Sequence, residues 1–146
     1  MPLVDQAPHA LAVVVSAGNE GQDLELTASQ TRFKAALAVA PGLYRARIAA
    51  LAIRFDVAAP QVALSQARTQ WGSCTRKRDG STRILLNWKL MHFELPLIDY
   101  VAAHELAHLR HMNHSASFWR EVARVYPEYR AARAALRERG HLIPEL

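Results

Sequence analysis

Residues 104–108 read His-Glu-Leu-Ala-His, a pattern that sets two metal-ligating side chains and an acid at a fixed spacing. Four helical residues turn the chain by about 400° and advance it by about 6 Å, so His104 and His108 would project from nearly the same face of a helix. One zinc ion could bind both imidazoles at about 2.0–2.1 Å. Glu105 would lie beside them, close enough to take a proton from a zinc-bound water. Shuffling this composition gives roughly 0.02 matches by chance, so we interpret the pattern as a zinc site with Glu105 as general base.

A catalytic zinc ion usually keeps three protein ligands and one open position, so the pattern requires a third donor. His111 and His114 compete for that place. His111 would still be helical, and three ligands on one straight helix wrap a tetrahedral ion poorly. His114 lies beyond the helix end expected at Asn113, where the chain can bend back over the metal. We therefore favour His114 and place His111 at the rim of the site or behind the ligands. Glu94 and Glu121 are weaker alternatives.

A metal, a base and an open position together predict a hydrolase, because zinc generates a hydroxide near neutral pH that attacks a carbonyl carbon or a phosphorus. Peptide hydrolysis is the commonest use of this pattern, so we expect a zinc-dependent metallopeptidase acting on a peptide or protein substrate. Two alternatives stay open. One is a zinc-dependent nucleotide phosphohydrolase, and the other is a binding module in which the metal only stabilises the fold.

Three further positions are candidates for substrate contact or for support of the site. Trp71-Gly72-Ser73-Cys74 could place a backbone turn or a thiol near the metal, although Cys74 more often would simply be buried. Asn87 could donate to a developing oxyanion, although a polar group at a strand end more often bonds backbone. The apolar strand expected over residues 83–88 could pair with an extended peptide if it lies at the sheet edge over the helix.

Charge is distributed unevenly along the chain. Residues 1–31 carry four acids and no Lys or Arg, whereas residues 32–146 carry all 18 basic residues against nine acids, a net charge of +9. This basic half makes a nucleotide or nucleic-acid partner possible, but nucleic-acid binding is not favoured. The basic loop 76–78 is best interpreted as solvated, and Arg130, Arg133 and Arg137 as one face of an amphipathic surface helix that could equally meet nucleic acid.

The elements that must position these residues indicate an α+β fold. Short strands are expected at residues 11–15 and 24–26, followed by a helical region at 28–56 that Pro41-Gly42 leaves as one long or two shorter helices. Residues 62–66 alternate in polarity and precede a strand pair with a loop at 76–81. We expect this small sheet to pack against the motif-bearing helix.

Local signals mark the helix boundaries downstream of the sheet. Pro96 suits the first turn of a helix running to about His111, and Asn113 suits the left-handed position that would end it. A further helical region should begin near Ser117, break near Pro127 and end at Gly140.

Composition limits the remaining possibilities. The length of 146 residues suits a single domain, and a hydrophobic fraction of 51% excludes the compositions that leave chains disordered. Cys74 is the only cysteine and cannot form an internal disulfide, and no Lys or Arg precedes Arg32 to form the basic start of a signal peptide. Charged or polar residues interrupt each apolar stretch, so no membrane span is expected. We expect a cytoplasmic protein, and the oligomeric state is left open.

The order Trp71-Gly72-Ser73-Cys74, Asn87-Trp88, His104 to His108, His114 and Phe118-Trp119 resembles the YgjP-like family of zinc metallopeptidases, which is distantly similar to SprT-like proteases. The resemblance covers residues 66–119 well, and the short acidic segment 1–27 is atypical. It implies a zincin-like domain over residues 1–146, with zinc on the three histidines 104, 108 and 114 and Glu105 as the catalytic residue.

Overall fold

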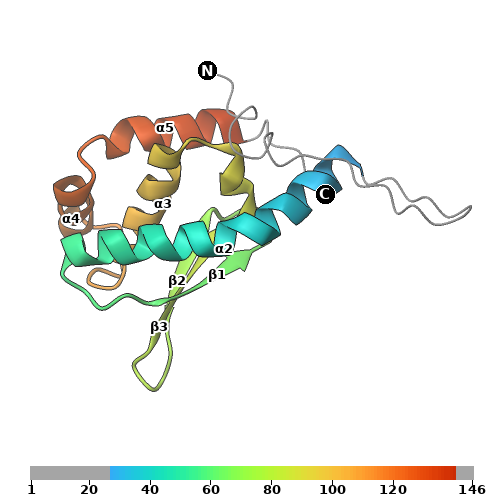
Figure 1. Ribbon diagram of the computed structural model, residues 1–146. Helices are drawn as coiled ribbons and strands as arrows, with labels where there is room; N and C mark the ends of the chain where they lie inside the picture. Colours follow the sequence, from blue (N-terminus) through green and yellow to red (C-terminus); the bar gives the residue numbers. More distant parts are fainter. Residues whose placement is uncertain (1–26, 141–146) are drawn as a thin grey trace, which may run out of the picture.

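The computed structural model describes residues 27–140, which form four helices, a short 3₁₀ helix and a three-stranded sheet (Figure 1). The strands expected at residues 11–15 and 24–26 lie outside the described residues. The helices and strands are not interleaved as alternating βα units, because all three strands follow one another between the first and second described helices. The predicted α+β class is therefore confirmed.

Helix α2 (Ala28–Phe55) is one continuous helix, so Pro41 does not divide this region into two shorter helices. Thr27 and Gln30 cap its start reciprocally, each side chain accepting from the backbone N–H of the other. The helix ends at Asp56, which takes the left-handed conformation with φ of 56°. Buried side chains continue on both sides of Pro41, from Ala36 to Phe55. Burial of this stripe of side chains stabilises the helix by more than the loss of the one backbone hydrogen bond that Pro41 cannot donate costs.

Residues 30–55 of α2 are long and apolar enough to cross a membrane by length and composition, with a mean hydropathy of 1.4 over the best 18-residue window. The expectation that no stretch meets this measure was wrong, because alanines and leucines outweigh the few charges when averaged. One third of that window is buried inside the fold. The buried stripe packs against the sheet and against helix α3 (Leu95–Ala107).

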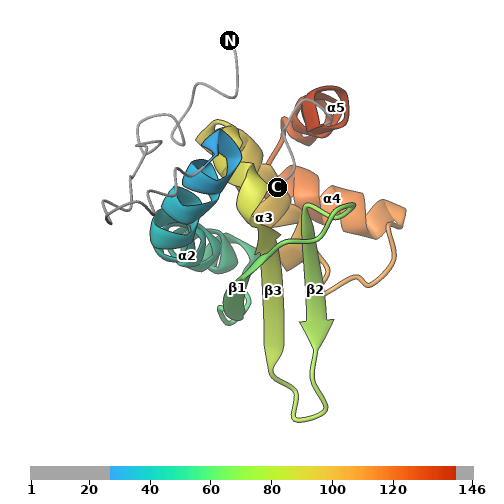
Figure 2. The ribbon, with the colours of Figure 1, turned by 90° about the vertical axis from the view of Figure 1, so that its right-hand side faces the viewer.

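The sheet has the strand order β1-β3-β2, with β1 (Gln61–Ser65), β2 (Gly72–Arg76) and β3 (Thr82–Asn87). Strand β3 runs parallel to β1 and antiparallel to β2, and the β2–β3 hairpin extends away from the helices (Figure 2). The hairpin and its loop match the expectation. The idea that the strand at residues 83–88 lies at the sheet edge was wrong, because both edges of β3 are paired. Within residues 27–140, the strand beside α3 with an unpaired edge is β2.

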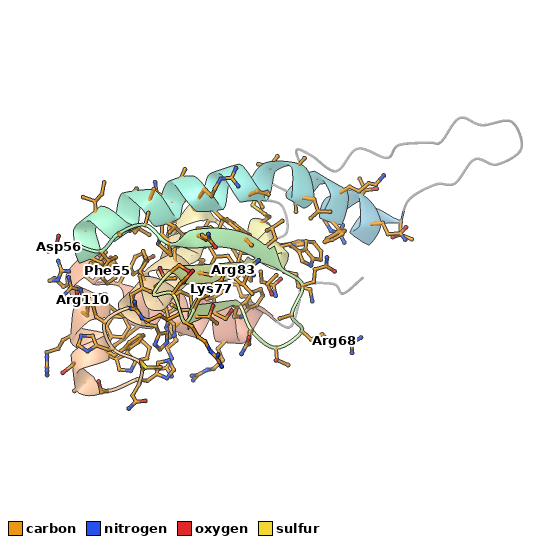
Figure 3. All side chains as sticks on the ribbon, turned by 90° about the horizontal axis from the view of Figure 1, so that it is seen from below. Phe55, Asp56, Arg68, Lys77, Arg83 and Arg110 are labelled. Atoms are coloured by element: carbon orange, nitrogen blue, oxygen red, sulfur yellow. The ribbon has the colours of Figure 1, made fainter. Side chains whose placement is uncertain are left out.

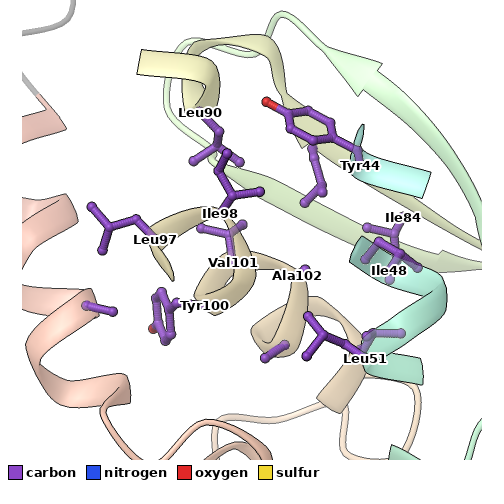
Figure 4. Close-up of a cluster of buried hydrophobic side chains, with 14 of the residues drawn as sticks. Tyr44, Ile48, Leu51, Ile84, Leu90, Leu97, Ile98, Tyr100, Val101 and Ala102 are labelled. Atoms are coloured by element: carbon purple, nitrogen blue, oxygen red, sulfur yellow. The ribbon is translucent and has the colours of Figure 1, made fainter. Parts of the chain in front are cut away.

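Helix α3 lies between α2 and the helix α5 (Tyr129–Arg139), and most of its side chains are buried (Figure 1). The 3₁₀ helix η2 (Trp88–His92) leads into it, and Pro96 occupies its first turn as expected. Figure 4 shows its apolar residues, among them Ile98, Val101 and Ala102, packed towards Ile48 and Leu51 of α2 and Ile84 of β3. The helix that carries the metal-ligating pattern is therefore the central element of the core.

Helix α3 ends earlier than the sequence indicated, at Ala107 instead of about His111. The N–H groups of residues 108–110 donate to carbonyls three residues back, at 3.0–3.2 Å, so the last turn tightens and the helix stops. Asn113 is not left-handed, because Asp56 is the non-glycine residue with positive φ in the part of the chain that the structure describes. The expected C-terminal cap at Asn113 was therefore wrong.

The last two helices follow the predicted boundaries. Helix α4 (Ala116–Val125) is capped by the Ser115 side chain, which accepts from the backbone N–H of Phe118, and α5 ends at Gly140. The break between them falls at Pro127. Both helices contact α3, and the buried Phe118 and Leu136 belong to the shared core.

Candidate metal centre

His104 and His108 lie at the end of α3, and His114 lies on the loop that joins α3 to α4. Two long side chains hold this loop region against the rest of the fold. Arg76 of β2 donates to the carbonyl oxygen of Leu109 at 3.2 Å, and Arg110 donates to the carbonyl oxygen of Asp56 at 2.9 Å. Figure 3 shows Arg110 beside Asp56 at the end of α2.

The three histidines converge on one point. Their ring centroids are 5.0 Å apart for His104 and His108, 5.1 Å for His104 and His114, and 4.8 Å for His108 and His114. The Nε2 atoms of His104 and His114 are 3.2 Å apart, and one ligating nitrogen from each ring lies within 4.8 Å of the others. The three imidazoles are thus positioned to hold a single metal ion. Neither Glu94 nor Glu121 belongs to this group, and each faces an arginine instead.

The chemistry of these donors fits a metal ion. Burial, together with the neighbouring histidines and Arg133, lowers the pKa of His104 to about 3, and burial also lowers the pKa of His108. Both rings are therefore neutral at pH 7, which is the form that binds a metal. His108 donates from Nδ1 to the carbonyl oxygen of His111 at 3.0 Å, and this leaves its Nε2 free to accept a metal. His111 thus supports the group through its backbone.

A buried aromatic residue packs against all three histidines. Phe118 of α4 is fully buried, with ring centroids 4.5 Å from His108 and 5.0 Å from both His104 and His114. These contacts restrict the ring orientations before any ion binds, so less rotamer freedom is lost on binding.

Glu105 is buried, with 6% of its surface exposed, and burial raises its pKa to about 7. It lies against the first residue of β2. A Cβ atom at Gly72 would come within 3.0 Å of both Cγ and Oε2 of Glu105 and within 3.1 Å of Val101. The space that Glu105 occupies therefore exists because residue 72 has no side chain, and this is a role for the Trp71 to Cys74 sequence that pattern reasoning did not identify.

Asn87 is buried and uses its side chain to hold the loop that precedes β2. Its amide donates to the carbonyl oxygens of Ala67 at 2.7 Å and Gln70 at 2.9 Å, and its carbonyl oxygen accepts from the Lys89 N–H at 3.0 Å. Its backbone N–H donates to Trp71 at 2.9 Å. With both amide hydrogens donated to backbone, Asn87 positions the loop and does not point a free donor at the metal site.

Cys74 is half-buried on β2, opposite Ile84 of β3. Burial, with a smaller effect of the Glu105 charge, raises the pKa of its thiol to about 11. A thiol at that pKa stays protonated at neutral pH and is a poor ligand or nucleophile.

A pocket of about 340 Å³ opens directly beside the histidines. His104 and Glu105 form one wall, and Trp71, Tyr100 and Leu136 supply apolar surface. The full lining consists of Gln70, Trp71, Gly72, Tyr100, Val101, His104, Glu105, Arg133, Leu136 and Arg137. The arrangement combines an ion-binding group, a buried carboxylate and space for a substrate.

Residues 18–139 match the family model described as the YgjP-like metallopeptidase domain. The chain belongs to the YgjP-like family. Its fold is also similar to the crystal structure of the metallopeptidase zymogen of Pyrococcus abyssi abylysin, with a TM-score of 0.55 and 25% sequence identity. The similarity covers 70% of this chain and 98% of that one. Among curated proteins no match to the sequence was found.

Membership of the YgjP-like family confirms the resemblance that the sequence motifs indicated, and the similarity to a metallopeptidase confirms the zincin-like α+β fold. Sequence reasoning missed Tyr100, Arg133 and Arg137 as pocket residues. Tyr100 precedes His104 by one helical turn, a spacing that could have placed it near the site. The two arginines belong to α5, and no local sequence pattern predicts that this helix packs against α3.

Proposed function

We propose that this YgjP-like protein is a zinc-dependent metallopeptidase in which His104, His108 and His114 hold the metal and Glu105 is the general base. The observation that carries the proposal is the convergence of three imidazoles within 4.8 Å beside a buried carboxylate. Three nitrogen ligands with one open position are the usual donor set of a catalytic zinc.

Zinc bound there would supply a Lewis acid that polarises a carbonyl group and makes water a nucleophile near neutral pH. Glu105 accepts the proton of the attacking water at a carboxylate oxygen and then delivers it to the nitrogen of the leaving amine. Burial raises the pKa of the Glu105 carboxyl, and the charge of a bound zinc ion would act in the opposite direction and favour the carboxylate that accepts the proton.

Strand β2 is the element best placed to hold a peptide. Among the described strands it lies at an edge of the sheet, it contacts α3, and its first residue lies against Glu105. An extended peptide that pairs with this edge would bring its backbone past the site through main-chain hydrogen bonds. We therefore propose β2, and not the central strand β3, as the strand that holds the substrate.

Substitution of Glu105 by glutamine tests the proposed base. In Glu105→Gln the zinc content should match that of wild type, while turnover of a peptide substrate should fall by about 10²- to 10⁴-fold because the proton acceptor is lost. Glu121→Gln is the matched control, since Glu121 pairs with Arg124 outside the pocket. Wild-type turnover in Glu105→Gln would rule out Glu105 as the base.

A nucleotide phosphohydrolase is the second candidate, because two arginines line the pocket beside His104. Peptides and nucleoside triphosphates should be assayed side by side with the same zinc-loaded protein. Hydrolysis of the triphosphate alone, with the same dependence on Glu105, would replace the peptidase proposal. A binding function that is unchanged in Glu105→Ala would favour a metal-stabilised module without catalysis.

A further inference from the structure

We propose that Arg133 and Arg137 of α5 form a subsite that binds a carboxylate of the peptide substrate, either an acidic side chain or the C-terminal carboxylate. The inference rests on the proposed peptidase function, which it deepens by naming what the substrate carries. The two arginines are four positions apart in the sequence, so they lie on the same face of α5 one turn apart. Both arginines line the pocket that His104 and Glu105 of α3 also line.

The two guanidinium groups have no acidic partner among residues 27–140. Three other arginines of this region pair with carboxylates: Arg47 with Asp99 at 2.7 Å, Arg124 with Glu121 at 2.9 Å and Arg139 with Glu94 at 3.7 Å. No such ion pair involves Arg133 or Arg137 in this described part of the chain, and both side chains are exposed to solvent. Two uncompensated cations at the rim of a catalytic pocket favour an anionic occupant.

Arg133 is held in place by aromatic packing. Its guanidinium carbon lies 5.0 Å from the ring centroid of Trp119, which in turn stacks on Tyr129 with centroids 5.1 Å apart. A guanidinium group stacked on an indole keeps its edge N–H groups free to donate, and the stacking reduces the rotamer freedom lost on binding. Arg133 therefore presents its N–H donors to the pocket before a ligand binds.

The surroundings of the arginines favour a carboxylate attached to an apolar chain. Trp71, Val101 and Leu136 line the same pocket, so part of the bound group leaves water and its charge interaction with arginine is strengthened. A guanidinium fork matches the two oxygens of a carboxylate. Glu105 is the pocket's own carboxylate, and it belongs to α3, whereas the two arginines belong to α5.

A neighbouring arginine on the same helix provides the matched control. Arg130 is one turn before Arg133, and its guanidinium carbon lies 5.4 Å from the Tyr129 ring centroid. It lines a different depression, together with Arg120 and Pro127, and not the pocket beside His104. Arg130→Gln therefore removes the same charge from the same helix without changing the proposed subsite.

The test is peptide binding to zinc-loaded Glu105→Gln protein, which should hold a substrate without cleaving it. Three hexapeptides of otherwise identical sequence are compared by titration calorimetry. The first, neutral peptide contains one Gln and has an amidated C-terminus. The second is the same peptide with Glu in place of that Gln. The third keeps the Gln but has a free C-terminal carboxylate. At least one carboxylate peptide should bind about tenfold to a hundredfold tighter than the neutral peptide, because a hydrogen bond to a charged group contributes on that scale.

The preference for the carboxylate should disappear in the Arg133→Gln, Arg137→Gln double variant and persist in Arg130→Gln. Circular dichroism checks that each variant is folded. A second double variant, Arg133→Lys with Arg137→Lys, retains both positive charges and should keep part of the preference for the carboxylate. Equal affinity for all three peptides would overturn the subsite, as would a preference that the double variant leaves intact.

Two further arms separate failure of the subsite from failure of the peptidase proposal. Wild-type protein is assayed for cleavage of the neutral peptide, which tests the peptidase function without any carboxylate. If no peptide is cleaved but the arginine-dependent preference for a carboxylate persists, the peptidase proposal fails and the subsite stands. Titration with a nucleoside triphosphate is the last arm, and tighter arginine-dependent binding of the triphosphate than of either carboxylate peptide would overturn the assignment to a carboxylate.

Discussion

The fit between Glu105 and Gly72 is the most specific residue-level feature of the site. A buried carboxylate needs both space and a fixed orientation, and the missing side chain at Gly72 supplies the space. The orientation matters for the proposed role of Glu105, because a general base acts only within hydrogen-bonding reach of the proton it takes.

In Gly72→Ala, the added methyl group should displace the Glu105 carboxylate, since it would come within 3.0 Å of Cγ and Oε2. We expect peptide turnover to fall about tenfold or more while zinc content stays the same, because the histidines are not touched. The control is Gly42→Ala on α2, where a Cβ would meet nothing within 4 Å. That change should leave turnover unaltered and stabilise the fold by about 0.5–1 kcal/mol. Full activity in Gly72→Ala would show that the close approach to Glu105 has no role in turnover.

Cys74 should react slowly with alkylating reagents. With a pKa of about 11, roughly one thiol in a thousand is ionised at pH 8, so labelling of the folded protein should be about a hundredfold slower than that of a free thiol. The rate should rise with pH until about pH 11, because a raised thiol pKa delays formation of the reactive thiolate. Mass spectrometry of native and urea-unfolded protein measures both rates. Equally fast labelling of the two forms would contradict the burial of this thiol.

At the scale of the elements, α2 and α3 are joined by a partly buried ion pair. Arg47 donates from Nε and Nη2 to the two carboxylate oxygens of Asp99, at 2.7 and 2.9 Å. A two-bond pair of this kind fixes the helix that carries His104 and Glu105 against the longest helix of the fold.

Removal of one partner should cost more than the pair itself contributes, because the other charge stays partly buried without compensation. We expect Asp99→Ala to lower the free energy of unfolding by about 1–3 kcal/mol, and the melting temperature by several degrees. Glu121→Ala removes the more exposed pair with Arg124 and should cost no more than about 0.5 kcal/mol. Thermal unfolding of the three proteins checks the order, and a larger loss in Glu121→Ala would contradict it.

The ends of elements were harder to predict than their existence. The sequence indicated the motif helix and the choice of His114, but placed the helix end at His111 and its cap at Asn113. The helix stops at Ala107, where the next three N–H groups donate three residues back, and beyond it the carbonyl oxygens of Leu109 and His111 accept from the Arg76 side chain and the His108 ring. Arg76 belongs to β2, so its hydrogen bond depends on tertiary contacts that local patterns do not contain.

At the scale of the whole molecule, residue types and spacing identified the chemistry but not the order of the strands. The hairpin of β2 and β3 was predictable from its loop, whereas the parallel pairing of β1 with β3 was not. That pairing moves β3 to the centre and leaves β2 at the edge beside Glu105. The same limit applies to the pocket, because Arg133 and Arg137 reach it only through the packing of α5 on α3.

Metal content is the measurement that tests the central claim most directly. Elemental analysis should find about one zinc per chain in wild type and in His111→Ala, because alanine retains the backbone carbonyl oxygen that His108 contacts. His114→Ala should lose the metal, since only two imidazoles would remain. A wild-type protein that stays free of zinc after zinc is added, or zinc retained in His114→Ala but lost in His111→Ala, would contradict the three-histidine centre.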